Sequence, residues 1–103
     1  MLFLQCPGAP GLATTKPVPV VSAFFGIVIR MFHEEHGVPH FHAEHQGRHA
    51  SIALDGTVLA GELGSAAALR LVREWAGLHQ SELSRNWLKL RNGGTPERIA
   101  PLD

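Results

Sequence analysis

The stretch "HFHAEHQGRHASIALDGTVLAGEL", residues 40–63, decides the fold because it predicts two β-hairpins in succession. Gln46-Gly47 and Asp55-Gly56 are two-residue turn signals, and the Asp-Gly pair favours a type I′ turn. When both pairs are taken as hairpin loops, His42 lies opposite Ser51 on the first strand pair. Ser51 then lies opposite Ala60 on the second, so both turns specify one common register.

The two hairpins agree on which side chains share a face, because successive side chains of a strand point to opposite sides of the sheet. The predicted apolar face comprises Phe41, Ala43, Ala50, Ile52, Leu54, Leu59 and Leu63. The predicted polar face comprises His40, His42, Glu44, His49, Ser51 and Glu62. We therefore expect an antiparallel meander with one face buried.

The segment before this stretch also predicts strand structure. "VPVVSAFFGIVIRMF", residues 18–32, is dense in β-branched and aromatic residues. Within residues 27–32 the alternation puts Ile27, Ile29 and Met31 on the buried side and Arg30 on the other side. Residues 18–21 are expected to form a short edge segment, since proline is confined to the edges of sheets.

The segment after the stretch predicts helix. Residues 65–94 begin at a favourable N-cap, Ser65, and end at Gly93-Gly94, and their apolar residues recur at steps of three and four. This pattern gives one long helix, or two helices separated by a kink near residues 77–81. His79 lies in the apolar stripe, where we expect a packed, hydrogen-bonded core residue. The expected fold is α+β, with a meander of about four strands packed on one long C-terminal helix.

The composition indicates one domain over residues 18–103 and a disordered lead, or a mis-called start, over residues 1–17. The chain of 103 residues has a formal net charge of zero, which excludes a global basic field for nucleic acid. Its single cysteine excludes an intramolecular disulfide and favours a cytoplasmic location. No segment approaches the roughly 18 apolar residues of a spanning helix, so we expect no membrane association.

Six of the seven histidines lie in residues 33–49, which makes this segment the candidate site. The spacing of "HFH" puts His40 and His42 on one face of a strand, about 7 Å apart. With His36 on the preceding loop and the carboxylate of Glu44, they form a candidate ligand set for a divalent metal, zinc above all.

Two other interpretations of the same residues remain open. His36, His40 and His42 could do acid–base chemistry without a metal, such as RNA cleavage through the 2′-hydroxyl, with Arg30 stabilising the charge of the transition state. Alternatively, the histidines simply form the solvated face of an antiparallel sheet.

Three blocks of the sequence resemble a bacterial family of small domains of unknown function, DUF4160. They are "GIVIRMF" at residues 26–32, "EHGVPHFHA" at residues 35–43 and "VREWAGLHQSEL" at residues 72–83. Family members typically read H-x-P-P-H-F-H-A, and Val38 stands where the family usually has proline. The residues that match the family pattern are His36, Pro39, His40, Phe41, His42, Ala43, Trp75 and His79.

The resemblance implies a genomic setting rather than an established activity. Members are often encoded beside a second small protein, as a toxin–antitoxin-type pair. Family members also usually begin directly before "PVVS"-like residues, so Val18 is expected to be a GTG start and residues 1–17 a mis-called extension.

Together these observations favour a toxin-like component that acts on RNA, with His36, His40, His42 and Arg30 as its catalytic residues. The alternative is a non-catalytic module that binds a metal or a partner, in an antitoxin or transcription-regulatory role. The expected partner is the small protein encoded by the neighbouring gene. RNA and a second copy of the chain are further candidates.

Overall fold

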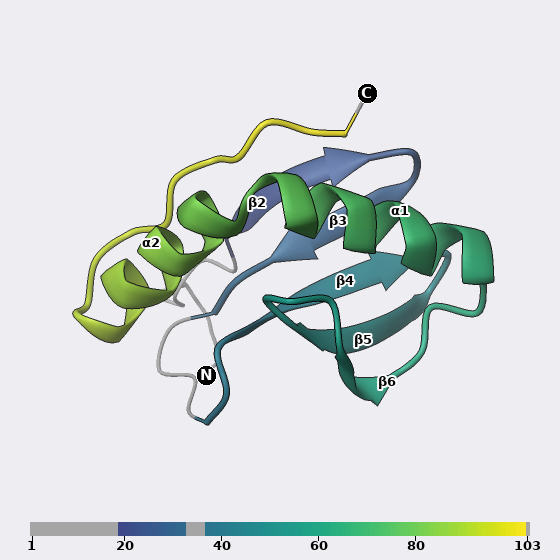
Figure 1. Ribbon diagram of the computed structural model, residues 1–103, viewed down its shortest axis with the longest axis horizontal. Coiled ribbons are helices and arrows are strands. Elements are labelled where there is room, and N and C mark those ends of the chain that lie inside the picture. The colour runs from purple at the N-terminus through teal and green to yellow at the C-terminus, as the bar shows by residue number, and fades with distance from the viewer. Residues whose placement is uncertain (1–18, 33–36, 103) are drawn as a thin grey trace, which may run out of the picture.

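The computed structural model describes residues 19–32 and 37–102 and has an α+β fold, as expected (Figure 1). Its antiparallel sheet contains β2 (Val20–Phe24), β3 (Ile27–Arg30), β4 (His40–His45), β5 (Arg48–Ala53) and β6 (Val58–Gly61), in that order. Two helices, α1 (Ala66–Leu78) and α2 (Gln80–Arg91), pack on one face of the sheet. The sheet has five strands where about four were predicted, and the two helices match the kinked alternative of the predicted helical segment.

The hairpin of β4 and β5 has the predicted register throughout. His42 pairs with Ser51 and Glu44 pairs with His49, and the loop between the strands is Gln46-Gly47. Both loop residues have positive φ, 50° at Gln46 and 79° at Gly47, as a type I′ turn requires. The alternation in this hairpin therefore separates a buried face from a polar face as the sequence indicated.

The hairpin of β5 and β6 differs from the prediction at its turn. The Ala53 carbonyl accepts a hydrogen bond from the N–H of Gly56, and the Ala53 N–H donates to the carbonyl of Thr57, so the loop has three residues. Ser51 still pairs with Ala60, but Ile52 pairs with Val58 across an irregularity in the register. Leu59, expected on the apolar face, is consequently 45% exposed.

Asp55 stabilises this three-residue loop through its side chain. The backbone N–H of Thr57 donates to the Asp55 carboxylate over 2.9 Å, and this hydrogen bond lowers the pKa of the carboxyl. Asp and Asn side chains commonly form such bonds in turns, two residues along the chain.

The hairpin of β2 and β3 contains a first strand that extends beyond the predicted edge segment, residues 18–21. Its turn is Phe25-Gly26, with φ of 51° and 76°, and β2 extends to Phe24 rather than ending near residue 21. Phenylalanine is not a typical residue at positive φ, so the turn carries no recognisable signal. Ile27, Ile29 and Met31 are buried and Arg30 is half-buried, which confirms the predicted alternation of this segment.

The helical segment is divided at His79, within the predicted kink region. The Ser65 hydroxyl caps α1 by accepting from the N–H of Ala68 over 3.1 Å, as predicted. At the break, His79 has φ of −124° and ψ of 32°, and its N–H donates to the carbonyl of Ala76, three residues back. The tighter bond and non-helical backbone end α1 and start α2 in a new direction.

The core fills the space between the helices and the sheet. Trp75 of α1 is completely buried, and its ring lies 5.5 Å from that of Phe24 and 5.7 Å from that of Phe41. Val72 and Leu83 pack into the same cluster from the two helices. The opposite face of the sheet carries Arg30, His42, Glu44 and Ser51 among its side chains.

The C-terminal segment, residues 92–102, runs back along the helices and reaches the edge of β2 (Figure 1). The Asn86 side chain donates to the carbonyl of Glu97 and accepts from its N–H, each over 2.8 Å. The indole N–H of Trp75 donates to the carbonyl of Ala100, and the Ile99 N–H donates to that of Val21.

Two further predictions concern the N-terminal lead and the membrane. The lead over residues 1–17 and the start at Val18 lie outside the described residues. Within the described ranges, neither helix is long and apolar enough to cross a membrane.

Candidate functional site

The candidate residues of the described strands lie on the face of the sheet away from the helices. Arg30 of β3 pairs with His42 of β4, and His42 pairs with Ser51 of β5, so the three residues form one row across the sheet. Arg30, His42 and Ser51 are all half-buried. His36, the third predicted histidine, lies outside the described residues.

The strand alternation brings the rings of His40 and His42 together. Their centroids are 5.1 Å apart and their planes meet at 75°. Nδ1 of His40 lies 2.8 Å from the carbonyl oxygen of Val38. Because a carbonyl oxygen only accepts, Nδ1 carries the proton, and Nε2 is the basic nitrogen of the neutral ring.

His42 has a different partner at the same nitrogen. Its Nδ1 lies 3.3 Å from the hydroxyl oxygen of Ser51. A hydroxyl group donates or accepts, so this contact suits both the neutral and the protonated ring. Nδ1 of His40 therefore contacts a carbonyl group, whereas Nδ1 of His42 contacts a hydroxyl group.

Two aromatic side chains extend the histidine pair into a row of four rings. The ring of Phe32 meets that of His42 edge-on at 4.5 Å, and the ring of Trp87 lies 5.3 Å from that of His40. We call these four residues, Phe32, His42, His40 and Trp87, the ring row. The row joins the open face of the sheet to α2, because Trp87 is a helix residue that is only 5% exposed.

Phe32 and Trp87 were not among the residues predicted for the site. The alternation of residues 27–32 is a signal for Phe32, since it puts this side chain on the same face as Arg30. No local pattern places Trp87 beside His40, because that contact depends on where α2 crosses the end of the sheet.

Arg30 and Glu44 form an ion pair beside the histidines. The Nε of Arg30 donates to Oε2 of Glu44 over 2.9 Å, and their side chains are 26% and 44% exposed. The predicted metal set thus includes a carboxylate that binds a guanidinium in this structure. Among residues 19–32 and 37–102, no group of three or more His, Cys, Asp or Glu residues could hold a metal ion.

Two further histidines, His79 and His45, have structural surroundings. Nδ1 of His79 lies 2.7 Å from the Glu82 carboxylate, and its ring lies 5.6 Å from that of Trp75. Nδ1 of His45 lies 3.3 Å from the carbonyl oxygen of Leu63 at the end of the sheet. His79 is thus the packed, hydrogen-bonded residue that the apolar stripe predicted.

Fold and site together define a small α+β domain whose open sheet face carries a histidine pair. The family model described as "Domain of unknown function (DUF4160)" matches residues 26–88, and the chain belongs to this family. The matched segment runs from the turn before β3 into the last turns of α2, so it contains the ring row. No curated protein and no solved structure matches the chain.

Proposed function

We propose that this protein is the toxin-like component of a toxin–antitoxin-type pair, and that it cleaves RNA by general acid–base catalysis at His40 and His42. The observation that carries the proposal is the contact between the two imidazoles, 5.1 Å apart, with Arg30 paired to His42. Cleavage through the 2′-hydroxyl requires a base, an acid and a cation. These three groups are neighbours on the open face.

His40 is suited to the role of general base. Its hydrogen bond to the Val38 carbonyl fixes the proton on Nδ1, which makes Nε2 the nitrogen that accepts a proton. In the proposed reaction Nε2 takes the proton of the 2′-hydroxyl while the 2′-oxygen attacks phosphorus. Histidine is the side chain that most often serves as a general base or acid in enzymes.

His42 then acts as the general acid. In its protonated form it gives a proton to the 5′-oxygen as the bond from phosphorus to that oxygen breaks. The products are a 2′,3′-cyclic phosphate and a new 5′-hydroxyl, so atoms and charges balance. Ser51, 3.3 Å from Nδ1, orients the ring and is not a nucleophile in this scheme.

Arg30 is the cation that stabilises the pentacoordinate phosphorane. A guanidinium presents five N–H donors in a plane, and the bond to Glu44 engages the donor on Nε. The ion pair also restricts the rotamers of Arg30, which reduces the entropy lost when a phosphate binds. Glu44 is therefore a positioning residue in the proposed reaction.

A divalent metal held by His36, His40, His42 and Glu44 is the competing proposal for this face. In that case zinc would supply an activated water, and Glu44 would exchange Arg30 for the ion. The two proposals differ in their response to a chelator, since only the metal-dependent reaction stops in EDTA.

The test measures cleavage of a single-stranded RNA oligonucleotide, in EDTA and in added zinc, by the wild type and three variants. His40→Ala and His42→Ala should each lower the rate by about 10²–10⁴-fold, the usual contribution of a general acid or base. His49→Ala is the matched control, because His49 lies on the same face but pairs with Glu44, outside the ring row. It should keep the wild-type rate.

The product and the substrate provide further checks. Mass spectrometry should find a 2′,3′-cyclic phosphate, and 2′-O-methylation of the RNA should abolish cleavage. Induced expression should arrest growth in the wild type and the His49→Ala strain only. A wild-type protein that neither cleaves RNA nor arrests growth would favour the binding module instead, and equal loss in all three variants would reject the assigned site.

A further inference from the structure

The imidazole of His40 is held in the tautomer that an isolated histidine side chain favours less. In water the proton of a neutral histidine side chain prefers Nε2, whereas the hydrogen bond to the Val38 carbonyl requires the proton on Nδ1. This hydrogen bond is exposed, so water competes for both of its groups. A second kind of contact is therefore expected to keep the ring turned toward Val38.

Trp87 makes such a contact from the helix layer. The centroids of the Trp87 and His40 rings are 5.3 Å apart, and the two planes meet at 54°. The ring of His42 also contacts that of His40, with the centroids 5.1 Å apart. An imidazole that touches two other rings has fewer accessible rotamers, and this restriction fixes the direction of Nε2.

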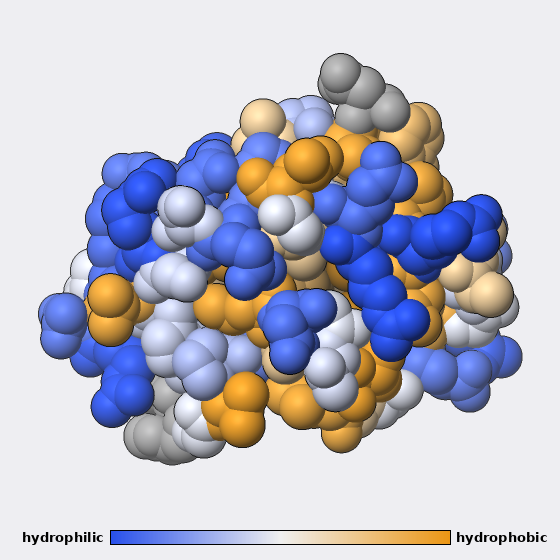
Figure 2. Space-filling model, viewed as in Figure 1, coloured by the Kyte–Doolittle hydropathy of each residue, from blue (hydrophilic) through white to orange (hydrophobic). Residues whose placement is uncertain are grey.

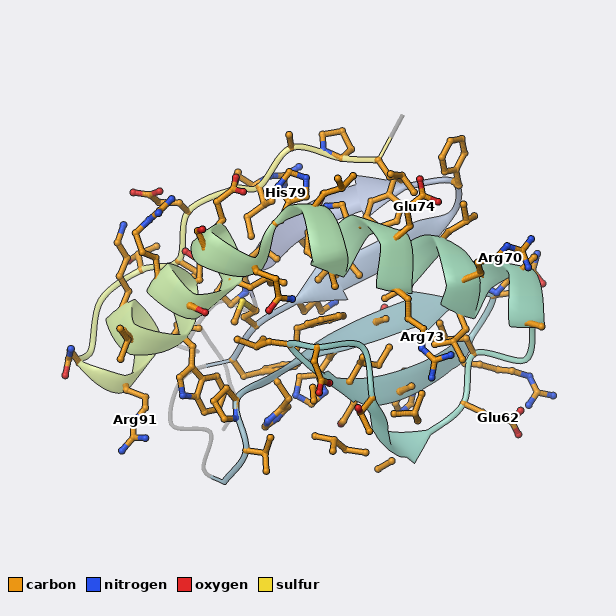
Figure 3. The ribbon with its side chains drawn as sticks, in the orientation of Figure 1. Glu62, Arg70, Arg73, Glu74, His79 and Arg91 are labelled. Atoms are coloured by element: carbon orange, nitrogen blue, oxygen red, sulfur yellow. The ribbon has the colours of Figure 1, made fainter. Side chains whose placement is uncertain are left out.

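The packing of α2 fixes the position of the Trp87 indole. Trp87 is 5% exposed and belongs, with Leu90, to the cluster of buried residues that forms the core. Figure 2 shows mainly hydrophilic surface over α2, whose two ends are marked by His79 and Arg91 in Figure 3. The apolar side of the helix therefore faces the sheet, and the indole has little freedom to move away from His40.

We propose that Trp87 is a positioning residue for the general base. Its indole keeps the imidazole of His40 turned toward the Val38 carbonyl, so that Nε2 of the neutral ring remains free to accept the proton of the 2′-hydroxyl. Trp87 touches neither the substrate nor the reacting atoms and acts through His40. The effect on cleavage rests on the proposed function, whereas the tautomer of His40 is measured without RNA.

Nitrogen-15 NMR of protein labelled at histidine measures the tautomer, because protonated and unprotonated ring nitrogens differ widely in chemical shift. The spectra are recorded at alkaline pH, where the rings are neutral, and His40→Ala identifies the His40 signals by their loss. In the wild type and in Trp87→Phe, which keeps a ring, the proton should lie on Nδ1. In Trp87→Leu, which lacks a ring, Nε2 should carry the proton in most molecules.

RNA cleavage by the same variants should separate kcat from KM. Trp87→Leu should lower kcat by about 10–100-fold, because a slightly misplaced catalytic group loses rate on this scale. The KM should stay within about twofold, since Trp87 does not bind the substrate. Trp87→Phe should recover most of the lost kcat.

Leu90→Ala is the control for damage to the helix. Leu90 is 4% exposed in the same helix but lies outside the ring row, so Leu90→Ala should destabilise the fold without changing kcat or the tautomer of His40. Circular dichroism establishes that all variants are folded at the assay temperature.

Two results would overturn the proposal. One is a His40 tautomer that is the same in the wild type and in Trp87→Leu, and the other is an equal change of tautomer or kcat in Leu90→Ala. A wild type that cleaves no RNA would reject the proposed activity instead. A changed tautomer in Trp87→Leu alone would then still establish that Trp87 positions His40.

Discussion

Among single residues, Gly61 has a conformation and a neighbour that both exclude a side chain. Its φ is 77°, and a Cβ atom there would overlap the backbone carbonyl oxygen of His49. Gly47 has a similar φ of 79°, but a Cβ atom there would meet nothing within 4 Å. An alanine at Gly47 is therefore opposed only by the positive φ, whereas an alanine at Gly61 is opposed by the positive φ and by the overlap with β5.

We expect Gly47→Ala to lower the free energy of unfolding by about 1–2 kcal/mol, the difference for a left-handed backbone. Gly61→Ala should lower it by about 3 kcal/mol or more, because the overlapping atom belongs to the backbone and β5 must move. Urea denaturation of both variants measures the two values. Equal losses would show that β6 can shift away from β5 without cost.

The histidine pair has some contacts that the sequence predicts and one that it does not. The period of two in a strand correctly placed His40 and His42 on one face, and the turn at Gln46-Gly47 correctly placed Ser51 opposite His42. The ring contact with Trp87 was not predictable, since it depends on the packing of a helix that is distant in sequence. Sequence therefore predicted the residues of one strand pair and missed the helix residue that touches them.

At the level of elements, the three hairpins differ in how strongly the sequence predicts their turns. Gln46-Gly47 was predicted correctly although Gln is not favoured at positive φ, because the strands on both sides alternate clearly. Asp55-Gly56 has the stronger signal, yet its loop has three residues, and this insertion moves Leu59 off the apolar face. Phe25-Gly26 has no recognisable signal and was missed.

The same comparison predicts a stabilising substitution. Phe25 has φ of 51° and its side chain is 58% exposed, so it contributes little to the core. Asn adopts this conformation more readily, and Asn-Gly is the preferred sequence of a type I′ turn. We expect Phe25→Asn to raise the free energy of unfolding by about 0.5–1 kcal/mol.

Phe25→Ala is the control for that substitution. It removes the exposed ring but keeps an ordinary side chain at positive φ, so it should not stabilise the protein. Thermal denaturation of the two variants compares them directly. A higher melting temperature for Phe25→Ala than for Phe25→Asn would assign the effect to the exposed ring instead of the turn.

For the whole molecule, the C-terminal segment fixes the relation between the helices and the sheet. Asn86 is 1% exposed and forms two hydrogen bonds to the backbone of Glu97. Lys89 donates to the carboxylate of Glu97, and this hydrogen bond lowers the pKa of the carboxyl. This arrangement was not predictable from the sequence, because a hydrogen bond between residues 99 and 21 leaves no periodic pattern in either segment.

Asn86→Ala should therefore lower the free energy of unfolding by about 2 kcal/mol, since it removes a buried side chain and both of its part-buried hydrogen bonds to the backbone of Glu97. Ser84→Ala is the control, because Ser84 is an exposed residue of the same helix. Hydrogen exchange should also become faster at Ile99 in Asn86→Ala. Unchanged stability would show that water replaces both bonds without cost.

The closure of β2 by residue 99 has a consequence for protein synthesis. The ribosome makes β2 well before the C-terminal segment that covers it, because 78 residues separate Val21 from Ile99 (99 − 21). At about 5–20 residues per second, the nascent chain carries an uncovered strand edge for several seconds. The nascent chain is thus open to unwanted strand pairing at β2 until residue 99 has left the ribosome.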